Sequence, residues 1–155
     1  MKITIDTTEI PTEVRVLIAR KTNNSEALSV LAKDETWEVR YAVVRNPNSS
    51  GKILSELAKD ENYYVRQAVA DNSNTSQELL SELAKDEDRD VRDAVARNPN
   101  TSEETLSELA NDKYYVVRKG VARNLNTSQE TLSKLVNDED WHVREAVANN
   151  PNFKR

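Results

Sequence analysis

The chain has 155 residues, enough for one domain with a sizeable core but too few for two of ordinary size. Its net charge of −5 opposes binding to nucleic-acid backbones and anionic membranes on average, and so favours a neutral or basic partner. Cysteine is absent, which excludes disulfides, thiolate metal sites, iron–sulfur clusters and cysteine nucleophiles.

Targeting and membrane signals are missing from the printed sequence. The first residues, MKITIDTTEI, are polar and acidic where a signal peptide needs an apolar stretch, and no uncharged apolar run approaches ~20 residues. We therefore expect a cytoplasmic protein with no membrane partner.

A fixed period organises the chain. The pentapeptide LAKDE begins at residues 31, 57 and 83, and the related LANDK and LVNDE begin at residues 109 and 135, so the period is 26 residues. We expect a single helical-repeat domain over residues 1–155. Its parts are an N-terminal cap and partial repeat at 1–30, full repeats at 31–56, 57–82, 83–108 and 109–134, and a truncated repeat at 135–155.

Each unit predicts two short helices. In the first, Thr75 and Glu78 have the spacing of a capping box, repeated at Thr101 with Glu104 and Thr127 with Glu130, and leucines such as Leu80 and Leu83 form one apolar stripe. In the second, Val91, Ala94, Val95 and Asn98 share a face, and the helix stops at Asn98-Pro99-Asn100, where asparagine tolerates a left-handed C-cap. Such short helices need stacking to be stable.

These patterns predict an all-α fold, an α-α superhelix built as a solenoid of stacked two-helix repeats of about 26 residues each. Eleven helices should lie between Pro11 and Asn149. Val39, Val43, Leu54 and Leu57 should be buried, together with their equivalents in every unit.

The stretch VRDAVARNPNTSEETLSELA, which recurs in varied form along the chain, closely resembles the leucine-rich repeat variant family of bacterial proteins. The pattern of Asp34 followed by Arg40 also looks like the second helix of HEAT-type repeats. The resemblance implies a right-handed superhelix of helix pairs, one helix of each sometimes tightened to 3₁₀ geometry. A founding member carries a cysteine-bound iron–sulfur cluster, which this cysteine-free chain cannot share.

The acidic and basic residues that recur in every unit are interpreted as structural. The HEAT-like pattern implies that the aspartates bridge to the arginines of neighbouring units and close off helix ends; they are Asp34, Asp60, Asp86, Asp112 and Asp138, with Arg40, Arg66, Arg92, Arg118 and Arg144. Asp86, Asp88 and Asp90 have calcium-loop spacing but lack the glycine and the final glutamate of such a loop. His142 has no second histidine or cysteine with which to share a metal. We expect no catalytic residue, cofactor or metal site, and hence no enzyme.

One variable column gives the candidate partner-binding residues. It consists of Trp37, Tyr63, Arg89, Tyr115 and Trp141, with Tyr41 one helical turn on. A helical wheel places these side chains opposite the valines, and their residue types dominate binding hot spots. Neighbouring helices lie ~8–10 Å apart, so rings in successive units should form a spaced row without stacking. The alternative is that the rings fold over the gaps between units as packing.

The leading functional interpretation is a non-enzymatic protein- or peptide-binding scaffold that uses this exposed variable face. The alternative is a HEAT-like protein bound to a duplex nucleic-acid backbone through Arg45, Arg97 and Arg123, although Asp71 and Asn149 interrupt that column. A third interpretation, that the protein chaperones a chromophore, rests on fold analogy alone.

Of the two ends of the stack, we expect the carboxyl end to be the more prone to self-association. No helix follows Asn152, so Val143, Ala146 and Val147 should lack a neighbour on one side. This predicts weak end-to-end self-association through the C-terminal helix, fraying, or a cover made by Phe153.

Overall fold

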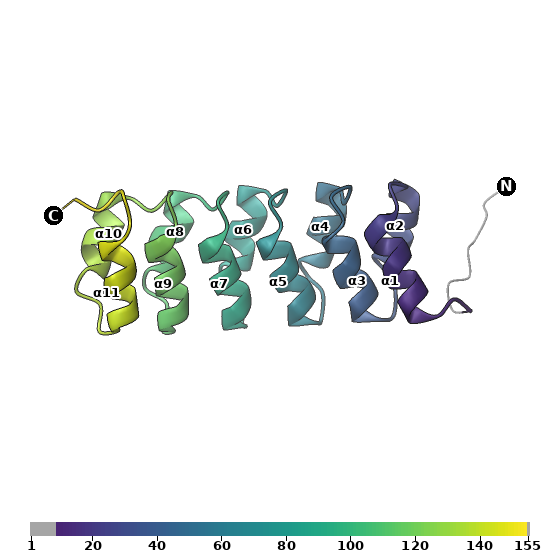
Figure 1. The fold of residues 1–155 in the computed structure, drawn as a ribbon, viewed down its shortest axis with the longest axis horizontal. Coiled ribbons are helices and arrows are strands. Elements are labelled where there is room, and N and C mark those ends of the chain that lie inside the picture. Colours follow the sequence, from purple (N-terminus) through teal and green to yellow (C-terminus); the bar gives the residue numbers. More distant parts are fainter. Residues whose placement is uncertain (1–8, 155) are drawn as a thin grey trace.

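A computed structural model describes residues 9–154 of the chain. This part contains eleven helices and no strand, so the predicted all-α solenoid and its helix count are confirmed (Figure 1). The helices are α1 (Thr12–Lys21), α2 (Ser25–Leu31), α3 (Trp37–Val44), α4 (Gly51–Leu57), α5 (Tyr63–Asp71), α6 (Gln77–Leu83), α7 (Arg89–Arg97), α8 (Glu103–Leu109), α9 (Tyr115–Arg123), α10 (Gln129–Leu135) and α11 (Trp141–Ala148). Most of the cap expected at the amino end lies outside the described residues.

The helices form two parallel rows. The odd-numbered helices make one row and the even-numbered helices the other, with α1 and α11 at opposite ends of the stack (Figure 1). Each odd helix packs mainly against the next odd helix, and each even helix lies against the odd helices before and after it. The core therefore runs along the whole length of the molecule.

The core is built from the same positions in each unit. The central leucine of every even helix is 0% exposed, at Leu28, Leu54, Leu80, Leu106 and Leu132. The predicted burial of Val39, Val43, Leu54, Leu57 and all their equivalents in residues 31–154 is confirmed. Small residues let the odd helices approach closely, because a Cβ atom added at Gly120 would lie 2.9 Å from Cβ of Ala96.

The even helices begin differently from the prediction. The N-cap of α6, α8 and α10 is the second hydroxyl residue of each pair, so that Ser76 accepts a hydrogen bond from Leu79 N, and Ser102 and Ser128 do the same in later units. The preceding threonine instead closes the odd helix before it: Thr75 Oγ1 donates to Val69 O at 2.6 Å. The predicted capping boxes were therefore placed one residue too early, because both hydroxyl residues fit the local pattern.

The ends of the odd helices carry a second unexpected feature. No described residue has a positive φ, and Asn98 is extended, with φ −68° and ψ 129°, so the predicted left-handed cap is wrong. The Asn98 side chain points toward the preceding unit, where Nδ2 donates to Ala70 O at 2.6 Å and to Asn72 O at 3.1 Å. The same donor recurs at Asn46, Asn72, Asn124 and Asn150. These asparagines tie each unit to the one before it.

The two ends of the described stack agree with the prediction in part. Val143 and Val147 are 0% exposed because their face packs against the preceding unit, so they do not lack a neighbour, whereas Phe153 packs against the core, which is one of the predicted outcomes. At the amino end, Val14, Leu17 and Ile18 of α1 are 43%, 56% and 37% exposed. The larger apolar end face therefore belongs to α1.

Within residues 9–154, no helix has the length and apolar character needed to cross a membrane.

We expect Leu83→Ala to lower the free energy of unfolding by about 2–5 kcal/mol, because a leucine that is 3% exposed leaves a cavity when truncated. Denaturant melts measure the change. Leu125→Ala is the matched control, since Leu125 is 67% exposed and should cost less than about 0.5 kcal/mol. Equal losses in the two variants would contradict the packing described above.

We expect Asn98→Asp to lower the free energy of unfolding by at least about 2 kcal/mol, because a buried carboxylate would face two carbonyl oxygens that now accept hydrogen bonds. Asn100→Asp is the control. Its amide also donates to the preceding unit, to Ser73 O at 2.6 Å, but in an exposed position. Thermal melts in which both variants behave alike would show that burial of the Asn98 amide contributes little.

Candidate binding edge

A ladder of buried ion pairs joins the odd helices. In one rung, Arg118 donates from Nε and Nη2 to the two carboxylate oxygens of Asp138 at 2.7 and 2.8 Å, and from Nη1 to Asp112 O at 2.8 Å. The other rungs are Arg15 with Asp34, Arg40 with Asp60, Arg66 with Asp86, and Arg92 with Asp112. The predicted bridging role of these residues is confirmed.

Charge in the ladder is fixed by these contacts. The hydrogen bond with Asp138 raises the pKa of Arg118 despite partial burial, and the same holds for Arg40, Arg66 and Arg92 with their own aspartates. Burial acts to raise the pKa of Asp138, but the hydrogen bonds from Arg118 and from Asp140 N outweigh it, so that pKa is lowered. The Arg118–Asp138 rung therefore stays ionised at neutral pH.

The candidate calcium-loop residues take part in this framework. Asp86 accepts hydrogen bonds from Arg66 and from Asp88 N, and Asp88 accepts one from Asp90 N at 2.8 Å. In the described part of the chain, no three histidine or acidic side chains are grouped so as to hold a metal ion. These carboxylates organise the turn before α7.

Removal of one ladder arginine should show what a rung contributes. We expect Arg92→Met to lower the free energy of unfolding by about 2–5 kcal/mol, because it leaves the Asp112 carboxylate largely buried without its partner. Arg144→Met is the matched variant. Arg144 occupies the same position but is exposed, and should cost less than about 1 kcal/mol. Chemical denaturation compares the two, and similar losses would contradict the importance of the bridge.

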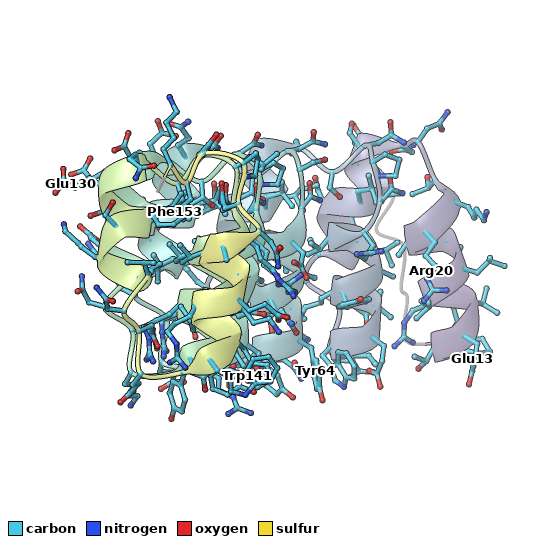
Figure 2. The ribbon with its side chains drawn as sticks, turned by 60° about the vertical axis from the view of Figure 1, so that its left-hand side comes forward. Glu13, Arg20, Tyr64, Glu130, Trp141 and Phe153 are labelled. Carbon is cyan, nitrogen blue, oxygen red and sulfur yellow. The ribbon has the colours of Figure 1, made fainter. Side chains whose placement is uncertain are left out.

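The predicted binding column lies at the first residue of the odd helices. Trp37, Tyr63, Arg89, Tyr115 and Trp141 begin α3, α5, α7, α9 and α11. They therefore lie along one edge of the stack, where the turns from the even helices arrive. Figure 2 shows Tyr64 and Trp141 at this edge, and Glu130 and Phe153 at the opposite one.

Exposure divides the column into two groups. Trp37, Tyr41 and Tyr63 are half-buried and pack against the core, whereas the wheel placed them in solvent. Arg89, Tyr115 and Trp141 are exposed, the last two at 40% and 57%. The wheel misplaces Trp37 and Tyr63 because they lie in the first helical turn, next to the following unit, and Tyr41, one turn on, packs edge-on against the Trp37 ring.

Rings from successive units do stack, so the expectation of a spaced row is wrong. The Trp37 ring lies 5.3 Å from the Tyr64 ring with planes 24° apart, and Tyr115 lies 5.5 Å from His142 at 25°. In both cases the first residue of one odd helix meets the second residue of the next. The offset of one position brings these rings together across the junction.

Tyr114, just before α9, lies close to three cations. The guanidinium of Arg89 lies 5.5 Å from the centre of the Tyr114 ring, and Arg92 and the Lys113 amine lie at 5.7 and 5.1 Å. Rings and cations thus lie at the starts of the odd helices from α3 to α11. We call it the aromatic edge: Trp37, Tyr41, Tyr63, Tyr64, Arg89, Tyr114, Tyr115, Trp141 and His142.

Tyr64, Tyr114 and His142 lie outside the predicted column. Each flanks the column by one position, which is the signal that points to them. His142 stacks on Trp141 at 3.7 Å, and its Nδ1 lies 3.0 Å from a carboxylate oxygen of Asp140. Burial acts to raise the pKa of Asp140, but its hydrogen bonds with His142 outweigh this effect and lower it.

Acidic side chains border the aromatic edge. The carboxylates of Glu61, Glu87 and Glu139 point outward, with side chains 88%, 91% and 86% exposed. Near them, a hydrogen bond with Tyr64 raises the pKa of Tyr63 to about 12. A shallow groove opens between α9 and α11, lined by Lys113, Tyr114, Tyr115, Arg118, Glu139 and Asp140.

The arginine column considered for nucleic acid is partly neutralised. Arg97 donates to Asp93 at 3.0 Å and lies 3.6 Å from Asp71 of the preceding unit. Burial raises the pKa of Asp93, and Arg97 opposes this shift. The guanidinium of Arg97 is therefore balanced by Asp71 of the same column and by Asp93 one helical turn earlier.

Comparison with known proteins agrees with the sequence resemblance. Residues 89–113 match the family described as leucine rich repeat variant. A solved structure described as a leucine-rich repeat variant with a novel repetitive structural motif is 29% identical, matches 92% of this chain, and superposes with a TM-score of 0.75. These helix pairs are thus similar in sequence and fold to leucine-rich repeat variant repeats.

The chain spans 57% of the length of that leucine-rich repeat variant structure. An engineered protein of solved structure is 17% identical, with 92% of this chain and 90% of that one covered, and a TM-score of 0.56. At that identity it shows the fold alone. A search of curated proteins found no match.

Proposed function

We propose that this chain is a non-enzymatic scaffold that binds a protein or peptide along its aromatic edge. The observation that carries the proposal is the gathering of exposed rings: Tyr64, Tyr114, Tyr115 and Trp141 are 37% to 57% exposed, and all lie on one edge of the stack. Exposed aromatic side chains grouped in this way are typical of interaction sites.

The charges of the edge favour a neutral or basic segment as its partner. Glu61, Glu87 and Glu139 have highly exposed side chains beside the rings, although each carboxylate also lies within 4 Å of a ladder arginine, and the chain carries a net charge of −5. Lysine or arginine side chains of a partner would stack on the rings and pair with these carboxylates. An extended segment lying across several units would meet this combination repeatedly.

The repeated architecture supports a scaffold over an enzyme. The buried charges pair with each other in every unit, and the one shallow groove described on the edge presents Tyr114 and Tyr115 beside Glu139. A duplex backbone finds less support, because Arg97 already faces Asp93 and Asp71. Binding of a protein or peptide to this flat, aromatic-rich edge therefore explains the arrangement best.

The test uses the double variant Arg89→Ala/Tyr115→Ala, since both side chains are exposed and their loss should leave the core intact. Immobilised wild-type protein is exposed to an extract of the source organism, and retained proteins are then purified and titrated. We expect the double variant to bind the retained partner at least about tenfold more weakly, with an unchanged melting temperature.

Leu125→Ala serves as the binding control, because Leu125 is 67% exposed on a different turn of the repeat. It should retain the partner fully. A partner held equally by wild type and double variant would refute the aromatic edge as the binding site, and an early melt of the double variant would identify these side chains as packing.

A further inference from the structure

The charge of the aromatic edge changes sign at one junction. The residue after the ladder aspartate is glutamate in four of the five units, at Glu35, Glu61, Glu87 and Glu139. In the unit of residues 109–134 it is Lys113, which is exposed as those glutamates are. The junction concerned, between α7 and α9, lies inside the stack, with described units on both sides.

In the four units with glutamate, that residue adds a second carboxylate to a ladder arginine. An oxygen of the glutamate lies 3.9, 3.6, 3.9 and 3.2 Å from Nη2 of Arg15, Arg40, Arg66 and Arg118. Among the residues that the structure describes, Arg92 has only the Asp112 carboxylate within 4 Å, at 2.6 Å from Nε and 3.3 Å from Nη2. Arg92 therefore lacks the outer acidic neighbour that the other bridging arginines have.

Three cations gather at this junction around one aromatic ring. The guanidinium groups of Arg89 and Arg92 lie 5.5 and 5.7 Å from the centre of the Tyr114 ring. The amine of Lys113 lies 5.1 Å from the same centre. An aromatic ring attracts cations through its face, but it carries no net charge and so leaves their positive charge in place.

Carboxylates of the chain offset only part of this positive charge. Asp112 binds Arg92. An oxygen of Asp90 lies 3.5 Å from Nε of Arg89, but both side chains are about half exposed, at 48% and 54%, so solvent screens the pair. Within residues 9–154, the Lys113 amine has no carboxylate within 4 Å. The surface between α7 and α9 therefore stays positive, between acidic side chains of the junctions before and after it.

A shallow groove joins this positive surface to the next acidic one. It is lined by Lys113, Tyr114, Tyr115, Arg118, Glu139 and Asp140. Lys113 and Glu139 thus border a single groove although they belong to successive units. A segment that lies in this groove would meet an amine from one unit and carboxylates from the next.

We propose that the partner of the aromatic edge is a segment of alternating charge. Its acidic side chain binds between Arg89 and Lys113, and takes the place that glutamate has in the other units, with charge-assisted hydrogen bonds from arginine and lysine. Basic side chains before and after it bind at Glu87 and Glu139. This inference rests on the proposed function and names the charge order of the segment that the edge would take.

The spacing of the units sets the spacing of these charges. Neighbouring helices pack ~8–10 Å apart, and an extended chain advances ~3.3 Å per residue, so one unit corresponds to about three residues of the partner. The expected order is therefore basic-x-x-acidic-x-x-basic. A segment that is basic throughout would instead place a like charge against Lys113, which opposes its binding at this junction.

The test titrates two synthetic peptides, RSGESGR and RSGRSGR, into the full chain and follows binding by NMR. We expect RSGESGR to bind at least about fivefold more tightly, with saturable shifts of the Lys113 and Tyr114 signals, although the net charge of −5 favours the more basic peptide. In Lys113→Glu the order of affinities should reverse. Lys52→Glu is the matched control, since Lys52 is an exposed lysine at the start of α4, and this variant should keep the wild-type order.

A wild-type protein that binds RSGRSGR as tightly as RSGESGR or more so, an unchanged order in Lys113→Glu, or no saturable shift with RSGESGR at millimolar concentration would overturn the inference. The proposed function is tested separately, by the retained partner and the variant Arg89→Ala/Tyr115→Ala. A retained partner that binds Lys113→Glu more tightly than wild type would leave the edge as a binding site and overturn the charge order alone.

Discussion

Every junction in this molecule depends on an arginine that binds two units at once. The guanidinium of Arg118 donates one hydrogen bond to a carbonyl oxygen of its own unit and two to the carboxylate of the next unit. One planar group therefore fixes both the turn before α9 and the position of α11. A buried ion pair stabilises only when its remaining donors are also satisfied. The carbonyl contacts meet that condition, and they explain why aspartate and arginine recur together.

A second set of contacts works in the opposite direction along the stack. The arginines reach toward the following unit, and the asparagines such as Asn98 reach back to the preceding one. Between these two lines of polar contacts lie the valines, the alanines and Gly120, which set a short distance between odd helices. The aromatic edge follows from this spacing, because it brings the first residue of one helix against the second residue of the next.

The period, the helix pairs, the core and the bridging arginines could be predicted because the residues that form them recur in the sequence of every unit. The choice between Thr75 and Ser76 as N-cap could not, since both satisfy the same local rule and only the buried carbonyl of Val69 separates them. The role of Asn98 depends on a carbonyl 28 residues earlier. Stacking of Trp37 on Tyr64 depends on the offset between two helices, which a wheel drawn for one helix does not contain.

The distance in sequence spanned by these junctions has a consequence for folding. The arginine contacts join residues 19 or 20 apart, and the asparagine contacts join residues 27 or 28 apart, at each junction in turn. The chain therefore closes loops of the same modest length wherever it begins to fold, and its contact order stays low for its size. A further unit would increase the free energy of unfolding without slowing the formation of any contact already present. The time needed to form contacts in such a stack depends on the length of one repeat and not on the length of the chain.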